Sequence, residues 1–201
     1  INPEIKPETG YNYELGLKAQ WLDKKLYTEL AFYTVQVSDL LVAERVDNDQ
    51  FVGRNAGKTS HNGIEVLMNY KDLTFNSLLI NPYASLTIND YSFEDFTDND
   101  IDFAGNDLTG VADKVFNLGL DLIHDSGLRF NVNYRHTGEI PLDDANSIYS
   151  DSYNLVNLRA DYEFKIAQHF TTTIYSGVNN VFDTTYATQV LPNATGFGGA
   201  A

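Results

Sequence analysis

The chain has 201 residues, about one domain's worth, and its 28 acidic and 13 basic side chains give a formal net charge of −15. That charge argues against a nucleic-acid groove, because binding to phosphates needs a basic stripe. The chain has no cysteine, which excludes disulfide frameworks and thiolate metal sites. No apolar run approaches the roughly 18 residues that a membrane-spanning helix requires.

The first half of the chain alternates between apolar and polar side chains, which predicts β-strands. We expect strands over residues 13–21, 26–37, 63–70 and 75–93. Both faces of the second strand carry bulky residues, so its inward face is not decided by the pattern. Pro82 interrupts the fourth strand, where we expect a bulge or an edge-like irregularity because proline has no ladder donor.

The second half contains the clearest hairpin. Alternation over residues 116–122 and 128–134 flanks a turn at residues 124–127, and further strands are expected over 156–164 and 170–178. A ragged strand or loop begins near Tyr186. No segment prefers the helical period, so the sequence predicts an all-β protein of about eight antiparallel strands.

The expected connections alternate between two classes. Short turns lie near Asp23, Lys71, Ser126 and Gln168, and long polar loops lie near Asp47, Asp100 and Asp144. Within the first of these, the polar stretch over residues 44–57, we expect a small hairpin turn at residues 47–49. This alternation is typical of an up-and-down outer-membrane barrel, which has short periplasmic turns and long extracellular loops. The polar face also carries ionisable side chains, which suits a water-filled lumen: Asp121, Arg129, Arg135, Arg159, Asp161 and Glu163. An ordinary soluble sheet with a charged solvent face is the alternative.

Four stretches together resemble the C-terminal barrel half of TonB-dependent outer-membrane receptors. They are NPEIKPE at 2–8 with YELGLK at 13–18, AFYT at 31–34, RNAGK at 54–58 with GIE at 63–65, and GVNNVFDTTY at 177–186. The resemblance covers essentially the whole chain in the family's order. It implies that residues 1–201 are the C-terminal portion of a larger barrel, and that the plug domain, the early strands and the last strand are missing.

The resemblance also implies a function in the bacterial outer membrane. Such a receptor captures a scarce ligand, here most simply a ferric siderophore, with haem, cobalamin and oligosaccharide as alternatives. The implied partners are outer-membrane lipids, the ligand and the energy-transducing protein TonB, which would engage the missing N-terminal part. No enzymatic activity and no cofactor are expected, and iron enters only as part of a transported chelate.

The residues expected to face the ligand path lie in the predicted long loops. Arginines suit carboxylate or catecholate oxygens, and aromatic rings suit flat chelates. The expected residues are Arg45, Arg54, Tyr91, Phe96, Phe103, His136 and Tyr149. For each of them an ordinary loop role is the competing interpretation.

Other motifs carry little chemistry. The run from Asp98 to Asp102 begins like a calcium loop, but Phe103 and Thr109 stand where an EF-hand needs glycine and glutamate. The four histidines are scattered without metal-ligand spacing, and Asp143, Asp144 and Asp151 have no nucleophile or phosphate cradle near them in sequence. We therefore expect a solvated acidic loop rather than a metal or catalytic site.

Two other protein classes remain open at this point: a small passive outer-membrane barrel and a soluble lipocalin-like carrier. Side-chain direction separates them. In both membrane alternatives Leu118, Leu120, Phe130 and Val132 point away from the barrel axis, and in the soluble carrier they point toward it. A closed ring of strands would favour the small barrel, and an open sheet would favour a portion of a larger receptor.

Overall fold

The computed structural model describes residues 5–47, 50–98 and 101–193. Within these ranges every regular element is a β-strand. No helix long and apolar enough to cross a membrane occurs in them. The strands are β1 Thr9–Trp21, β2 Leu26–Asp47, β3 Gln50–Tyr70, β4 Leu73–Phe75, β5 Leu78–Asp95, β6 Thr97–Asp98, β7 Ile101–Asp102, β8 Lys114–His124, β9 Leu128–Thr137, β10 Ile140–Pro141, β11 Tyr149–Ser150, β12 Tyr153–Ala167 and β13 Phe170–Val178.

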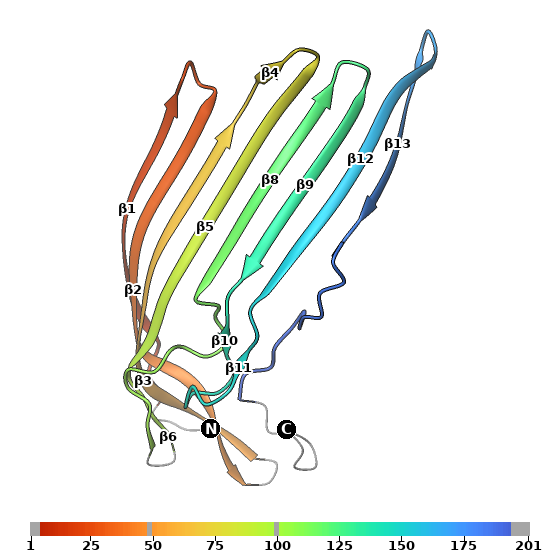
Figure 1. The fold of residues 1–201 in the computed structure, drawn as a ribbon. Coiled ribbons are helices and arrows are strands. Elements are labelled where there is room, and N and C mark those ends of the chain that lie inside the picture. The colour runs from red at the N-terminus through yellow and green to blue at the C-terminus, as the bar shows by residue number, and fades with distance from the viewer. Residues whose placement is uncertain (1–4, 48–49, 99–100, 194–201) are drawn as a thin grey trace.

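One antiparallel sheet dominates the molecule, in the order β1-β2-β3-β5-β8-β9-β12-β13, with β4 paired to β5. The expected all-β, up-and-down architecture of about eight strands is therefore confirmed. β1 and β13 are the two ends of this order and do not pair with each other, so the sheet is open. Figure 1 shows the sheet as a tilted, curved wall, with the short turns at one end and the longer connections at the other.

The β2–β3 connection differs from the long loop expected near Asp47. The two strands stay paired from Leu26 and Tyr70 out to Asp47 and Gln50, beyond the ends of their neighbours in the sheet. The projecting ribbon bends where Asp39 and Gly57 both have positive φ values, 57° and 36°. A Cβ on Gly57 would lie 1.1 Å from the carbonyl oxygen of Asp95, so only glycine fits this close approach.

The sheet is irregular at Pro82, although not through a bulge in its pairing with β8. Pro82 pairs in register with Leu120 of β8. On the other side, the β3 ladder ends at the pair Asn69–Tyr83 and the β4 ladder begins at Leu73–Ile80. Proline has no N–H to give to a partner strand, and the neighbouring strand is interrupted opposite it.

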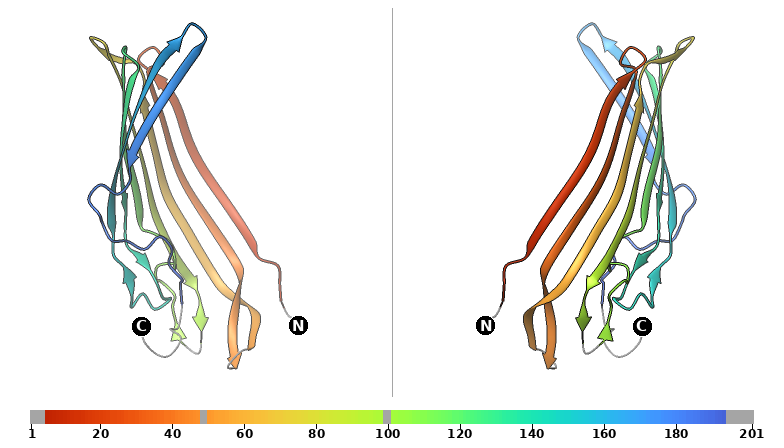
Figure 2. Two further views of the ribbon diagram at one scale, coloured as in Figure 1. Left: turned by 90° about the vertical axis from the view of Figure 1, so that its right-hand side faces the viewer. Right: turned by 90° about the vertical axis from the view of Figure 1, so that its left-hand side faces the viewer.

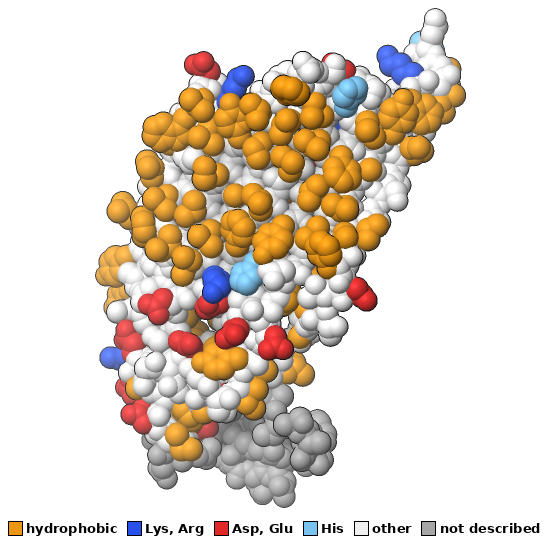
Figure 3. Space-filling model, viewed as in Figure 1, with side chains coloured by type: hydrophobic (Ala, Val, Ile, Leu, Met, Phe, Trp, Pro, Cys, Tyr) orange, Lys and Arg blue, Asp and Glu red, His pale blue; other side chains and the backbone are white. Residues whose placement is uncertain are grey.

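Apolar side chains gather on the convex face of the wall. Figure 2 shows the curvature, and Figure 3 shows that the face turned to the viewer in Figure 1 carries a broad apolar band bordered by acidic side chains on the loop side. The register aligns Leu15, Phe32 and Ile64 in one row and Leu118, Tyr134 and Val156 in another. Leu15 is 74% exposed and Leu118 48% exposed, so these rows do not meet in a dry interior as in a lipocalin-like carrier.

The only hydrophobic cluster of buried residues in the described part lies at the loop end. Phe93 and Phe96 are each 5% exposed and pack against Phe103 and Leu108. The rings of Phe93 and Phe96 stack with centroids 4.7 Å apart. This cluster anchors the chain between β5 and β8 and leaves the wall itself without a core of its own.

Candidate functional site

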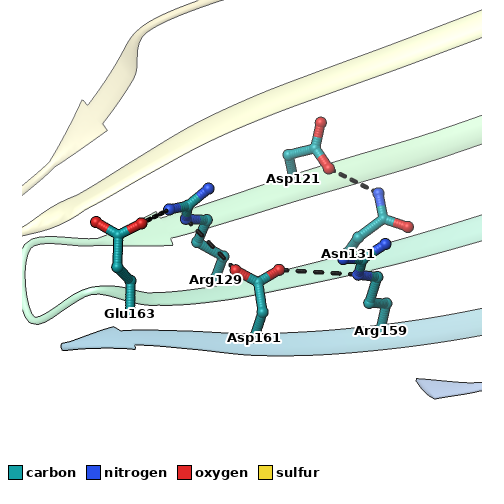
Figure 4. Close-up of polar contacts among 6 residues, drawn as sticks. All are labelled: Asp121, Arg129, Asn131, Arg159, Asp161 and Glu163. Carbon is teal, nitrogen blue, oxygen red and sulfur yellow. Dashed lines mark hydrogen bonds and ion pairs between the residues drawn. The ribbon is translucent and has the colours of Figure 1, made fainter. Parts of the chain in front are cut away.

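The concave face carries a charged cluster near the short-turn end, formed by Asp121, Arg129, Arg159, Asp161 and Glu163 together with Asn131. Figure 4 shows these side chains reaching across β8, β9 and β12 toward one another. Asn131 Nδ2 donates to Asp121 Oδ1 at 2.6 Å, and Arg129 Nη2 donates to Glu163 Oε2 at 2.9 Å. We call this set the lumenal charge cluster.

Asp161 is the centre of that cluster. Its side chain is 17% exposed and lies 3.5 Å from Arg129 Nε and 3.9 Å from Arg159 Nε. The guanidinium of Arg159 also lies over the ring of Tyr175, 5.2 Å from its centroid. The charges on this face thus satisfy one another in a polar, wet setting, as the ionisable side chains of the polar face predicted.

An aromatic cluster lies nearer the loop end of the same face. The hydroxyls of Tyr33 and Tyr91 are 2.8 Å apart, and Tyr33 Oη donates to Asn89 Oδ1 at 3.1 Å. The His61 ring lies 4.7 Å from the ring of Tyr91, and its Nε2 is 2.9 Å from Thr59 Oγ1. These residues come from β2, β3 and β5, which lie side by side.

Two tyrosines lie flat on this face because a glycine lies beneath each ring. Tyr33 faces Gly63 across the β2–β3 pair, and Tyr83 faces Gly119 across the β5–β8 pair. A Cβ on Gly63 would come within 2.2 Å of the Tyr33 ring, and one on Gly119 within 1.9 Å of the Tyr83 ring. Each glycine therefore lets an aromatic ring cover the wall instead of projecting into the lumen.

A cavity of about 290 Å³ lies at the loop end, between β5 and the segments at residues 107–113 and 139–149. Tyr91 and Tyr149 contribute aromatic surface to it, and its carboxylates are Asp90, Asp107, Asp113 and Glu139. Desolvation by its surroundings and the nearby charges of Asp107, Asp143 and Glu139 raise the pKa of Tyr149. This phenol is therefore neutral at physiological pH and can both donate and accept hydrogen bonds.

A hydrogen-bond network joins three loop segments around Asp144. Thr109 Oγ1 donates to Asp144 Oδ1 at 2.5 Å, and Asn106 Nδ2 donates to the Asp144 carbonyl at 2.8 Å. Asn193 Nδ2 donates to Asp144 Oδ2 at 3.0 Å, while the Asp144 N–H donates back to Asn193 Oδ1 at 3.2 Å. The carboxylates expected to be solvated loop groups thus also hold the loops together.

The expected ligand-path residues do not form one site. Tyr91 and Tyr149 both line the 290 Å³ cavity. Phe96 and Phe103 belong to the buried cluster instead, with ring centroids 5.7 Å apart, so their described contacts are within the loop.

His136 lies on the convex side of the wall. It pairs with Phe116 of β8 and Asn154 of β12, in the register of the convex apolar rows. Its Nδ1 is 2.9 Å from Asn154 Oδ1, which also accepts from Tyr134 Oη at 2.6 Å. Residues alternate between faces, so His136 lies on the convex side while its neighbour Arg135 takes the concave side, and a part for His136 in the ligand path stays a prediction.

Arg45 and Arg54 lie in the projecting β2–β3 ribbon, where Arg45 pairs with Phe51 and Arg54 with Val42. Only their backbone belongs to the described structure, so their part in the ligand path stays a prediction.

Three residues of the aromatic cluster were missed by sequence reasoning: Tyr33, His61 and Asn89. The sequence did contain a signal for Tyr33. It follows Phe32 directly and so lies on the other face of the strand, but both faces of this strand carry bulky residues and the pattern did not show which face is the inner one. His61 and Asn89 could not be joined to it without the strand register, which brings residues 28 and 56 positions apart together.

The motif residues on which the family resemblance rests form hydrogen bonds that stabilise the fold. Asn55 of RNAGK accepts the Lys6 N–H at 2.7 Å and donates to the Lys6 carbonyl at 2.9 Å. Glu8 of the same lead-in accepts the Leu41 N–H at 2.6 Å. Asn180 of GVNNVFD closes a turn by bonding both the N–H and the carbonyl of Thr184.

Metal ligands do not converge in the described ranges. No group of three or more His, Cys, Asp or Glu side chains in these residues could hold a metal ion. In the run from Asp98 to Asp102, the Asp102 carboxylate accepts the N–H of Ala104 at 2.9 Å, which is a turn contact. Asn99 and Asp100 lie outside the described residues.

Comparisons with known proteins agree with this architecture. Residues 1–181 match the family model described as TonB dependent receptor-like, β-barrel. The ferrichrome outer membrane transporter and phage receptor of Escherichia coli K12 is 25% identical over 198 residues, which are 96% of this chain and 25% of the relative. The chain thus spans about a quarter of that relative's length.

Solved structures of several receptors share the fold. The siderophore receptor PiuA from Acinetobacter baumannii superposes with a TM-score of 0.71 at 20% identity, over 94% of this chain and 26% of the receptor. The unliganded ferric citrate transporter FecA gives a TM-score of 0.75 at 22% identity, over 93% of this chain and 28% of the transporter. The two-faced open sheet, the alternating connections and the family match over most of the chain lead to one conclusion: this chain belongs to the β-barrel family of TonB-dependent receptors, whose relatives reside in the outer membrane.

Proposed function

We propose that this chain is the C-terminal part of the barrel of an outer-membrane receptor that takes up a ferric siderophore. The observation that carries the proposal is the division between the faces of the sheet. Side chains such as Leu118, which is 48% exposed although it lies on a central strand, need a lipid environment, while the opposite face holds paired charges and tyrosines suited to water and a polar ligand. The choice of a siderophore as the ligand is supported by the named relatives, a ferrichrome transporter and a siderophore receptor.

The ligand path in this proposal runs along the concave face from its loop end. Tyr91 is the residue best placed for it, because it belongs to the aromatic cluster and also lines the 290 Å³ cavity. Tyr149 lies across the same cavity, and Arg45 and Arg54 belong to the ribbon that projects beyond the wall at this end. The ligand is held without a covalent step, and passage depends on TonB acting through a plug domain that precedes the barrel.

Uptake by the complete receptor tests the proposal. A strain lacking the gene is compared with the wild type for accumulation of radioactive iron offered as hydroxamate, catecholate or citrate complexes. We expect one class of chelate to lose accumulation on deletion, and a protonophore to abolish the same signal because transport is energised. Equal accumulation of every chelate by both strains would overturn the siderophore assignment.

The role of Tyr91 is tested by ligand binding to the purified receptor. Tyr91→Ala should weaken binding of the accepted chelate by about threefold to tenfold, the range expected for losing one aromatic contact. Tyr13→Ala is the matched control, since Tyr13 is 69% exposed on the convex face and should leave binding unchanged. Unchanged binding in both variants would remove Tyr91 from the path and leave the uptake proposal untouched.

A further inference from the structure

An apolar groove of about 470 Å³ opens on the convex face near the short-turn end. Its floor is formed by Pro82 and Ala84, the smallest side chains in this part of the wall. The register places Ala84 directly between Met68 of β3 and Leu118 of β8. The remaining lining includes Leu26, Tyr70 and Leu73.

The groove exists because the sheet is interrupted here. β3 ends at Tyr70, β4 begins at Leu73, and the Asp72 N–H between them is taken by Asn81 Oδ1 at 2.8 Å instead of by a ladder carbonyl. Met68 and Leu118 rise on either side of the small floor and are 44% and 48% exposed. The result is a recess between these two large side chains.

Lysines gather at the end of this groove. Lys25 immediately precedes Leu26, Lys71 immediately follows Tyr70, and the Lys71 N–H donates to the Lys25 carbonyl at 2.8 Å. Lys24 lies in the same turn, so three of the 13 basic side chains of an acidic chain lie in two adjacent turns. All three are exposed, and none of them forms an ion pair with another of the described residues. Asp23 and Asp72 flank them in sequence.

Trp21 places this region at the boundary of the apolar band. It pairs with Leu26 and is 52% exposed, and its indole Nε1 donates to Thr28 Oγ1 at 2.9 Å. Exposed tryptophan is enriched where lipid tails meet headgroups. Lysines just beyond such a position extend their ammonium groups toward headgroup phosphates.

We propose that this groove binds one acyl chain of an anionic phospholipid in the leaflet on the short-turn side, with its phosphate at Lys24, Lys25 and Lys71. The groove is continuous with the lipid-facing surface, and its opening lies beside the only lysine group at this end of β2 and β3. Its volume is that of a small-molecule site. This binding is independent of which chelate the receptor transports.

Native mass spectrometry of the full-length receptor tests the site. The receptor is released from vesicles of equal parts phosphatidylglycerol and phosphatidylcholine with identical acyl chains, and the retained lipids are counted. We expect phosphatidylglycerol to be retained over phosphatidylcholine. Lys71→Gln should reduce that preference by about fivefold, the effect of one lysine near an anionic headgroup. Lys165→Gln, an exposed lysine near the short-turn end of β12, is the matched control and should change nothing.

The acyl-chain half of the site has its own variant pair. Ala84→Leu fills the floor of the groove and should abolish lipid retention, while Ala160→Leu places the same side chain on the convex face of β12 and should leave it intact. Retention of both lipids alike by the wild type would overturn the proposal. So would equal losses in Lys71→Gln and Lys165→Gln, because surface charge alone would then explain the preference. If the Ala84→Leu receptor does not assemble, the comparison of Lys71→Gln with Lys165→Gln still tests the proposal.

Discussion

The convex and concave faces of this wall use the same strands but depend on different surroundings. On the convex face, large side chains of interior strands such as Met68 and Leu118 remain 44% and 48% exposed, so their burial has to come from lipid. On the concave face, Asp161 is 17% exposed because two arginines close over it. The convex face is stabilised by the surrounding lipid, and the concave face is stabilised by contacts within the chain. The same kind of substitution should therefore have consequences of very different size on the two faces.

The largest expected effect is a charge placed on the convex face. Leu120 lies near the middle of β8, between Pro82 and Val132. Leu120→Arg in the full-length receptor should lower the free energy of unfolding by about 2–4 kcal/mol, because a guanidinium at mid-depth loses its hydration. Urea unfolding of the receptor in lipid vesicles measures this difference.

Thr173→Arg is the matched control on the concave face. Thr173 is exposed and lies opposite Glu163, so an arginine there meets water and a carboxylate and should cost less than about 0.5 kcal/mol. Equal destabilisation by the two arginines would mean that the faces are not solvated differently, and the membrane assignment of the convex face would fail.

The next effect concerns the rings that lie on the concave wall. Gly63→Ala should destabilise the receptor by about 1–3 kcal/mol, the cost of overpacking. The new Cβ would lie 2.2 Å from the Tyr33 ring, which must swing into the lumen and lose its bonds to Asn89 and Tyr91. Thermal unfolding of the purified receptor measures the change.

Gly16→Ala supplies the comparison on the same face. A Cβ there meets its nearest atoms at 3.7 Å, an ordinary contact, so the substitution should be neutral or slightly stabilising. In a Tyr33→Ala background the cost of Gly63→Ala should disappear. A cost that persists there would show that the glycine is needed for its backbone and not for the ring above it.

The strand pattern was predictable because it depends on local alternation. Rows such as Phe116, Leu118 and Leu120 show in sequence which residues share a face, and curvature then decides which face meets lipid. The polar stretch over residues 44–57 was expected to be a long loop with a small hairpin turn at residues 47–49, and its long paired strands were not expected because polar composition does not distinguish a solvated ribbon from a loop. Its pairing depends on hydrogen bonds between backbones, which side-chain pattern does not report.

The candidate site was less predictable, for a different physical reason. Aromatic residues in an expected loop can either bind a ligand or pack within the loop. Phe96, which is 5% exposed, packs within the loop. The aromatic cluster depends on register, since Tyr33 reaches Tyr91 only after β2, β3 and β5 are aligned. A one-residue error in that register would move each side chain to the other face.

A smaller effect is expected within the lumenal charge cluster. Asp161→Asn should cost about 1 kcal/mol, because it leaves two guanidiniums near each other in a partly shielded position. Glu163→Gln should cost less than about 0.5 kcal/mol, since the Glu163 side chain is 44% exposed and its pair with Arg129 is screened by water. Urea unfolding at low and high salt measures both. A larger effect for Glu163→Gln would show that shielding does not determine the strength of these pairs.

The smallest effect is a dependence on pH confined to the loop end. The Ser147 hydroxyl, followed by the N–H groups of Ile148 and Ser147, stabilises the Asp143 carboxylate and holds its pKa below the ordinary value of 3.8. A group whose pKa is lowered by folding contributes stability above its unfolded pKa and loses it as the pH falls through the folded value. Hydrogen exchange of the Ser147 and Ile148 amides, corrected for intrinsic rates, should therefore show constant protection from pH 7 down to about pH 4 and a loss below it. Asp143→Asn should weaken protection above about pH 4 and remove the transition, while the β8–β9 amides stay protected in both proteins. A transition between pH 7 and 5 would instead assign the loop's stability to a histidine, because no carboxylate with a lowered pKa titrates in that range.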